Sequence, residues 1–105
     1  MISVSVYQSV DLIKKIEISG HAQAANKGED LVCAGVSSIG IGTLNALDLL
    51  SKNTCECSIQ EACIHILVKD MEDKRTQIIL QTMLIQLSTM EERYSKNIKI
   101  KKQEV

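Results

Sequence analysis

The order of apolar and polar residues along the chain predicts alternating strands and helices. Residues 2–7 and 12–18 alternate aliphatic with polar or charged side chains, which is the period of half-buried strands. Residues 55–58 and 62–69 are expected to form two more strands. Residues 97–102 combine isoleucines with lysines, which is typical of a strand at the edge of a sheet.

Two longer stretches have the apolar spacing of helices. Between residues 31 and 52 the apolar side chains recur mostly three to five positions apart, and a second helix is expected over residues 73–94. The order strand, strand, helix, strand, strand, helix, strand predicts an α+β fold, a mainly antiparallel sheet with both helices packed on one face. Residues 1–105 contain no linker or low-complexity segment, so we expect a single domain.

Each helix carries a feature that needs an explanation. The first contains Gly35, Gly40 and Gly42, each of which costs about 0.5–1 kcal/mol relative to alanine. Either a neighbouring group approaches closely there or the helix kinks near Gly40. The apolar residues of the second helix spread beyond one face, which favours a symmetric homodimer, although burial between the sheet and the first helix is the alternative.

Composition and charge narrow the classes of partner. The 105 residues have a net charge of −1 and no Phe or Trp, so we expect no direct binding of nucleic acid. Residues 1–11 lack the basic and apolar regions of a signal peptide, and no stretch reaches the ~20 apolar residues that span a bilayer. These features predict a cytoplasmic protein that binds no membrane and keeps its four cysteines reduced.

A histidine and a cysteine supply the candidate chemistry. Asp30 is expected to cap the first helix, which would place Cys33 in its first turn, where the helix dipole favours a thiolate. The dipole contributes only about 0.3–1 kcal/mol, so a cation is also needed, and protonated His21 can supply it in a thiolate–imidazolium pair. By spacing alone, however, a small buried cysteine beside an unrelated loop histidine is the commoner arrangement.

Neighbouring residues complete the candidate site. Ser37 lies four positions after Cys33 and so on the same helical face, where its hydroxyl can orient the sulfur or the substrate. Gly20 and Gly28 are the expected hinges of the intervening loop, because glycine bends without steric cost. The polar part of this loop, residues 23–29, is expected to move when a peptide enters.

The remaining cysteines allow two other hypotheses. Cys55, Cys57, Cys63 and His65 could meet across a hairpin as the ligands of a structural zinc ion, but Cys-x-Cys is not the usual knuckle spacing. A thiol redox enzyme would need a nearby resolving cysteine, and the chain has no Cys-x-x-Cys. Both hypotheses are weaker than a Cys/His nucleophile.

One dense motif changes the balance in favour of catalysis. Residues 20–37 contain GHA, then five residues, then G-x-D-x-VCA-x-VS. This motif resembles the ribosomal-processing cysteine protease family of bacteria. Residues 80–100 are similar to that family's second helix and last strand. The resemblance is thin in between, where residues 58–62 read SIQEA rather than a turn built on Gly or Asn.

The resemblance implies an endopeptidase that needs no metal or cofactor. Its expected substrate is the N-terminal peptide of a large-subunit ribosomal protein, the twenty-seventh in the standard series, from which it would remove a short extension. Cys33 would be the nucleophile and His21 the base, with Asp30 and Ser37 close to them. A non-catalytic binding module on the ribosome remains the alternative, and it would need neither Cys33 nor His21.

Overall fold

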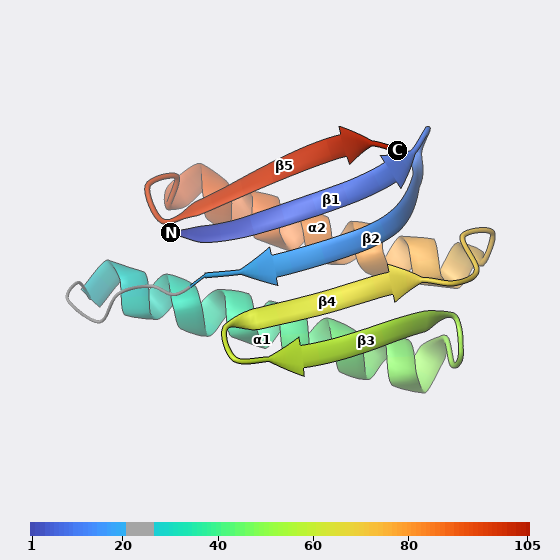
Figure 1. Cartoon of the computed structure of the whole chain (residues 1–105). Coiled ribbons are helices and arrows are strands. Elements are labelled where there is room, and N and C mark those ends of the chain that lie inside the picture. The colour runs from blue at the N-terminus through green and yellow to red at the C-terminus, as the bar shows by residue number, and fades with distance from the viewer. Residues whose placement is uncertain (21–26) are drawn as a thin grey trace.

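The computed structural model describes residues 1–20 and 27–105, and for residues 27–30 the backbone alone. Over these residues five strands and two helices follow one another in the expected order (Figure 1). They are β1 (Ile2–Ser9), β2 (Leu12–Ser19), α1 (Lys27–Leu50), β3 (Cys55–Gln60), β4 (Cys63–Val68), α2 (Lys74–Arg93) and β5 (Ile98–Glu104).

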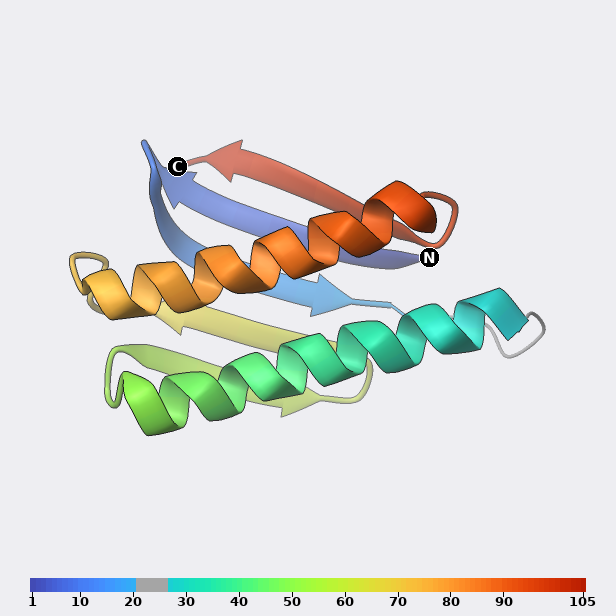
Figure 2. The same ribbon diagram turned by 180° about the vertical axis from the view of Figure 1, so that it is seen from behind.

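The strands form one sheet in the order β3-β4-β2-β1-β5. Neighbours pair antiparallel except for β1 and β5, which run parallel and are joined through the rest of the chain. Both helices lie on the same face of this sheet, and the other face is left uncovered by them (Figure 2). The predicted α+β architecture is therefore confirmed.

The core lies between the sheet and the two helices and is built from aliphatic side chains. Alternate residues of the central strands, such as Val6, Ile16 and Ile66, are completely buried because the strand period sends them all toward the helices. Leu80 and Leu87 bring one face of α2 into the same cluster. The period-two pattern of the strands thus determines which face of the sheet the helices cover.

The glycines of α1 mark close approaches rather than a kink. The helix is continuous from Lys27 to Leu50. A Cβ added at Gly40 would lie 2.7 Å from Cδ1 of Ile64 in β4, and one added at Gly35 would lie 2.7 Å from Cε of Met90 in α2. Nothing approaches Gly42 within 4 Å. Two of the three glycines therefore allow α1 to pack closely, one against the sheet and one against α2.

The hairpin with the unusual sequence turns tightly without glycine or asparagine. Gln60 and Cys63 are paired across β3 and β4, so Glu61 and Ala62 form the turn, with φ of +57° at Ala62. The amide of Gly20 donates to the carbonyl of Ala62 over 3.1 Å. This hydrogen bond holds the turn against the end of β2.

One stretch of α1 also satisfies the criteria of a membrane span. Leu31–Leu50 has a mean hydropathy of 1.4 and is long enough to cross a bilayer. This differs from the expectation that no stretch of the chain is apolar and long enough to do so. Three of its side chains, Val32, Val36 and Leu47, are nevertheless buried in the core of the α+β domain. Packing on the sheet accounts for these three side chains, whereas Leu31, Ile41, Leu49 and Leu50 of the same stretch are exposed.

The start of α2 is fixed by a carboxylate that accepts several hydrogen bonds. Asp73 is the N-cap, and its Oδ2 accepts from the Thr76 amide over 2.9 Å, from the Thr76 hydroxyl over 2.6 Å and from the Ser51 hydroxyl over 2.8 Å. The hydrogen bonds from the Thr76 side chain, the Thr76 backbone and Ser51 lower the pKa of Asp73. The network also ties α2 to the end of α1.

We predict that Asp73→Asn destabilises the protein in a pH-dependent way. Because hydrogen bonding lowers the pKa of Asp73 in the folded state, its stabilising contribution is present above the ordinary carboxyl pKa of about 3.9 and is lost as the pH falls through the lower folded value. Urea unfolding should show a clear loss of stability at pH 7. An equal loss in strongly acidic buffer would contradict this prediction.

Candidate active site

Cys33 lies in the second turn of α1, not in the first. The helix begins at Lys27, so Cys33 follows its first residue by six positions (33 − 27 = 6). Only the first four amides of a helix lack an intrahelical acceptor, and the amide of Cys33 is therefore used inside the helix. The expectations that Asp30 caps the helix and that Cys33 lies in its first turn were wrong.

The early start of α1 also changes the status of two other positions. Gly28 and Asp30 belong to the first turn of the helix, so Gly28 is not a loop hinge and Asp30 is not the N-cap. The apolar pattern could not reveal this, because residues 27–30 are polar or glycine and add no apolar position to it. Residues 23–26 of the predicted mobile loop lie outside the described residues.

Cys33 and Ser37 meet at one cavity, as their spacing predicted. The cavity has a volume of about 190 Å³ and lies between α1, the end of β2 and the β3–β4 hairpin. Cys33 is half-buried and Ser37 is exposed. Most of the other lining residues are aliphatic; the full lining is Ile2, Ile18, Gly20, Cys33, Val36, Ser37, Ile41, Ile59, Gln60, Ala62, Cys63 and Ile64.

Gly20 connects this cavity to the candidate base. It lines the cavity, and the next residue in the chain is His21, which lies outside the described residues. Gly20 has φ of +107°, a conformation that favours glycine, and a Cβ at this position would lie 2.3 Å from the carbonyl oxygen of Met1. The chain can therefore leave β2 in this direction only with glycine at position 20.

We predict that Gly20→Ala lowers the free energy of unfolding by about 1–3 kcal/mol, because both the positive φ and the contact with Met1 are unfavourable for a Cβ. Chemical denaturation of the variant should show this loss. Gly42→Ala is the matched control, since nothing lies within 4 Å of its added Cβ and alanine favours helix. Equal stability of the wild type and Gly20→Ala would contradict the prediction.

The remaining cysteines do not form the zinc site considered above. Cys55 and Cys57 share a strand face with Ile59, which is paired with the buried Ile64, whereas Cys63 and His65 alternate with buried residues and face the opposite side. No group of three or more metal-ligating side chains occurs in the described part of the chain. Strand alternation thus separates the four proposed ligands into two pairs.

These two pairs also differ in chemistry. Desolvation raises the pKa of Cys55, and desolvation together with the nearby Cys55 and Asp48 raises the pKa of Cys57 to about 11. Both thiols are therefore protonated at neutral pH. All four cysteines are within the described residues, and none forms a disulfide.

Comparison with known proteins identifies one family. The family model described as Cysteine protease Prp matches residues 1–99. Ribosomal processing cysteine protease Prp of Staphylococcus aureus is 34% identical over 90 residues, covering 84% of this chain and 85% of that protein. The protein of the same name from Bacillus subtilis is 30% identical over 107 residues, covering 95% of this chain and 96% of its own.

Solved structures extend the similarity to the fold. The essential ribosomal processing protease Prp of S. aureus has been crystallised with a substrate peptide, and its chain matches this one with a TM-score of 0.90 at 31% identity, covering 98% of this chain and 100% of that chain. The complex of that protein with a covalently linked product peptide matches this chain with a TM-score of 0.89 at 32% identity, covering 98% of this chain and 100% of that chain. A Streptococcus mutans structure with 22% identity and a TM-score of 0.84, covering 100% of this chain and 96% of that one, shares the fold.

Proposed function

From the premise that this chain belongs to the cysteine protease Prp family, we propose that it removes the N-terminal extension of a large-subunit ribosomal protein, the twenty-seventh in the standard series. The observation that carries this proposal is the shared cavity, where Cys33 and Ser37 lie beside Gly20, the residue before His21. The S. aureus protein has been crystallised with a substrate peptide and with a product peptide, which supports a peptide as the ligand of this chain.

The proposed reaction is acyl transfer from the peptide to the thiol. His21 takes the proton of Cys33, and the sulfur attacks the scissile carbonyl carbon. His21 then protonates the amine as the peptide bond breaks, which leaves a thioester on Cys33. Water, deprotonated by His21, hydrolyses the thioester and releases the new carboxylate and the free thiol.

Ser37 is the proposed donor to the oxyanion of this reaction. The amide of Cys33 lies within the helical hydrogen-bond ladder, whereas the Ser37 hydroxyl is exposed at the same cavity one turn further along α1.

We predict that Ser37→Ala lowers kcat about 10–100-fold with little change in KM, as loss of a transition-state donor does. The matched control is Ser38→Ala, because Ser38 lines the groove between the helices instead. Equal losses in both variants would contradict this role.

The lining of the cavity suggests which side chain of the substrate it holds. Its wall is mainly aliphatic, with Val36 and Ile41 from α1 and Ile59 from β3, and its few polar residues include Ser37 and Gln60. An apolar side chain next to the scissile bond would bury its surface there without stranding a polar group. A substrate with a charged residue at this position should be cleaved much more slowly.

Incubation of the enzyme with the uncleaved ribosomal protein tests the proposed substrate. Intact-mass measurement should show one cut that releases the N-terminal extension with the wild type and none with Cys33→Ala. A ribosomal protein already lacking the extension is the control and should remain intact. If the wild type leaves the uncleaved protein unchanged while it cleaves other peptides, the substrate proposal is wrong.

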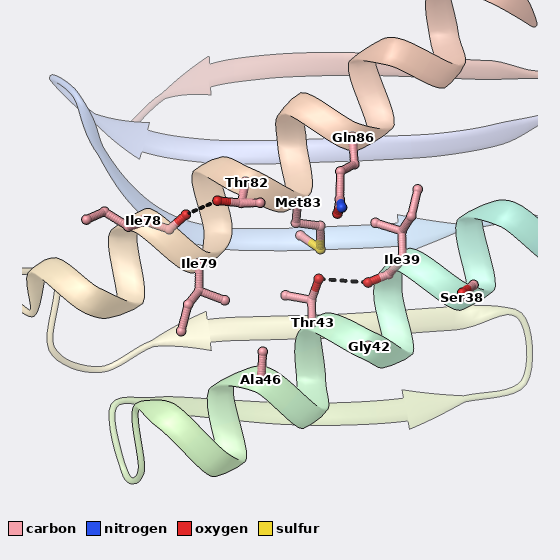
Figure 3. A pocket seen from close by; sticks show the side chains of 10 residues that line it. All are labelled: Ser38, Ile39, Gly42, Thr43, Ala46, Ile78, Ile79, Thr82, Met83 and Gln86. Atoms are coloured by element: carbon pink, nitrogen blue, oxygen red, sulfur yellow. Dashed lines mark hydrogen bonds between the residues drawn. The ribbon is translucent and has the colours of Figure 1, made fainter.

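A second copy of the chain is the proposed partner of the helical face. A groove of about 380 Å³ runs between α1 and α2, lined by residues that include Ile39, Gly42 and Ile79 (Figure 3). Ile78, which lines this groove, is 62% exposed, and Ile85, two turns further along α2, is 67% exposed. Light scattering should detect a dimer, and a double Ile78→Glu, Ile85→Glu variant should be monomeric.

The cytoplasm is the proposed compartment of this reaction. The uncleaved ribosomal protein would be available there before it joins the large subunit, and a reducing environment would keep Cys33 as a free thiol. Fractionation of cells into cytoplasmic, membrane and secreted material tests this localisation. Recovery in the membrane fraction would contradict this localisation and would favour Leu31–Leu50 as a helix that spans the membrane.

A further inference from the structure

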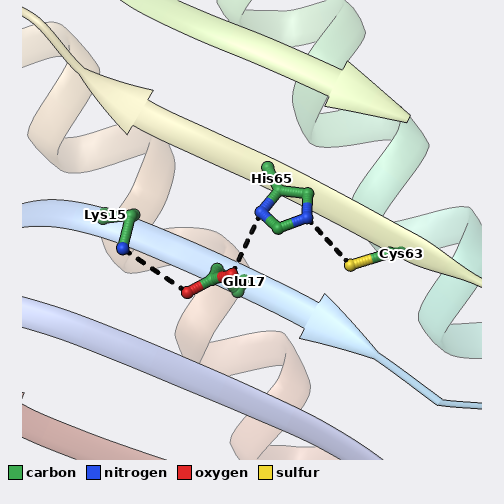
Figure 4. A network of polar contacts seen from close by, with 4 residues as sticks. All are labelled: Lys15, Glu17, Cys63 and His65. Carbon is green, nitrogen blue, oxygen red and sulfur yellow. Dashed lines mark hydrogen bonds and ion pairs between the residues drawn. The ribbon is translucent and has the colours of Figure 1, made fainter. Parts of the chain in front are cut away.

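A second cysteine of the chain lies in a Cys–His–Glu arrangement on the helix-free face of the sheet (Figure 4). Sγ of Cys63 lies 3.0 Å from Nε2 of His65, and Nδ1 of His65 lies 3.1 Å from a carboxylate oxygen of Glu17. Lys15 contacts the other Glu17 oxygen over 3.5 Å. The three groups therefore form a continuous chain from thiol to carboxylate.

The sheet register holds this arrangement in place. Cys63 and His65 are two positions apart on β4 and so point to the same face, and Glu17 on β2 is the direct cross-strand partner of His65. The cross-strand neighbours of Cys63 are Ser19 on β2 and Gln60 on β3, neither of which carries a charge. His65 is thus the only basic side chain that the described contacts place against this sulfur.

The contacts also determine the direction of proton transfer. A carboxylate only accepts hydrogen bonds, so Glu17 requires the proton of neutral His65 to be on Nδ1. Nε2 is then an acceptor and faces the thiol of Cys63. His65 is consequently positioned to take the thiol proton as the sulfur attacks an electrophile, while Glu17 stabilises the resulting imidazolium.

We propose that Cys63 is a second reactive thiol, which exchanges with low-molecular-weight disulfides on the helix-free face of the sheet. In the exchange, the sulfur of Cys63 attacks one sulfur of the small disulfide as His65 takes its proton. The disulfide bond breaks, and the departing thiolate receives that proton, so one mixed disulfide and one free thiol are formed. Excess small thiol reverses the reaction.

The position of Cys63 separates this chemistry from the proposed active site. Cys63 is among the residues that line the cavity at Cys33, but its sulfur points toward His65 on the helix-free face of the sheet. The reactivity of Cys63 therefore does not depend on the proposed function.

The reactivity is tested in a Cys33→Ala background with oxidised glutathione at pH 7, with the adduct located by digestion and mass spectrometry. We expect the rate of modification at Cys63 to fall about tenfold in His65→Gln and to a smaller extent in Glu17→Gln. The rate at Cys57 should not change in either variant. Ser58→Ala is the matched control, because Ser58 is the other cross-strand neighbour of His65 and should leave the Cys63 rate unchanged.

Equal Cys63 rates in the parent and in both His65→Gln and Glu17→Gln, with unfolding curves that confirm folding, would overturn the proposal.

Discussion

Replacing Cys33 by alanine is expected to lower kcat for cleavage of the ribosomal-protein peptide by about 10⁴-fold or more, because it removes the thiol on which the proposed acyl intermediate forms. Replacing His21 by alanine should cost about 10²–10⁴-fold, the usual contribution of a general base. KM should change little in either variant, since the aliphatic wall that binds the peptide is unaltered. Single-turnover kinetics followed by mass spectrometry measure both effects.

Two controls distinguish a catalytic from a structural role for these residues. Added imidazole should restore part of the activity of His21→Ala, because a small base can enter the space left by the side chain, but it should not restore that of Cys33→Ala. Cys57→Ala should cleave at nearly the wild-type rate, since Cys57 lies outside the cavity. Wild-type cleavage by Cys33→Ala would exclude Cys33 as the nucleophile and remove the basis of the mechanism.

Replacing Gln77 by alanine is expected to lower the free energy of unfolding by about 2–4 kcal/mol. The register of β1 and β2 shifts between Tyr7 and Gln8, and close to this shift Gln77 of α2 bonds both backbone groups of Ile13. Its Oε1 accepts from the Ile13 amide over 2.8 Å, and its Nε2 donates to the Ile13 carbonyl over 2.9 Å. Because Gln77 is buried, its replacement leaves the amide and the carbonyl of Ile13 without a hydrogen-bond partner, and water does not take the place of the lost side chain.

Two further variants test the amide of Gln77 specifically. Gln77→Glu keeps the shape but turns an acceptor toward the Ile13 carbonyl, so it should destabilise the protein more at pH 8 than at pH 5. Gln81→Ala, one turn further along α2 at an exposed position, should change stability by less than about 0.5 kcal/mol. Urea unfolding at one fixed protomer concentration compares all of them, and equal effects at positions 77 and 81 would contradict the argument.

The element order and the packing of both helices on one face could be predicted from the apolar pattern, because half-buried strands and helices have different periods. Alternation in β1 and β2 was clear, and Val4, Val6, Ile16 and Ile18 are all buried. The start of α1 could not be predicted in the same way. Its first turn is polar in sequence, so the pattern began at the apolar residue Leu31 rather than at Lys27, where the helix begins.

The candidate site was predictable where it depends on spacing within one element and not where it depends on pairing between elements. Four positions of helix bring Cys33 and Ser37 to one cavity whatever the rest of the fold does. The contact of His65 with Glu17 requires the register of β2 against β4, two strands that are separated by α1 and β3 in the chain. The sequence showed only that Cys63 and His65 lie two positions apart on one strand. It did not identify Glu17 as the partner of His65.

The parallel pairing of β1 with β5 has a consequence for synthesis on the ribosome. β1 is translated first but is paired on both sides, and its second partner is the last strand of the described fold. The sheet cannot be completed until Ile98–Glu104 has left the exit tunnel, and contacts between such distant segments form slowly. A nascent chain stalled before residue 98 should therefore be sensitive to added proteases, and it should become resistant only when β5 can dock.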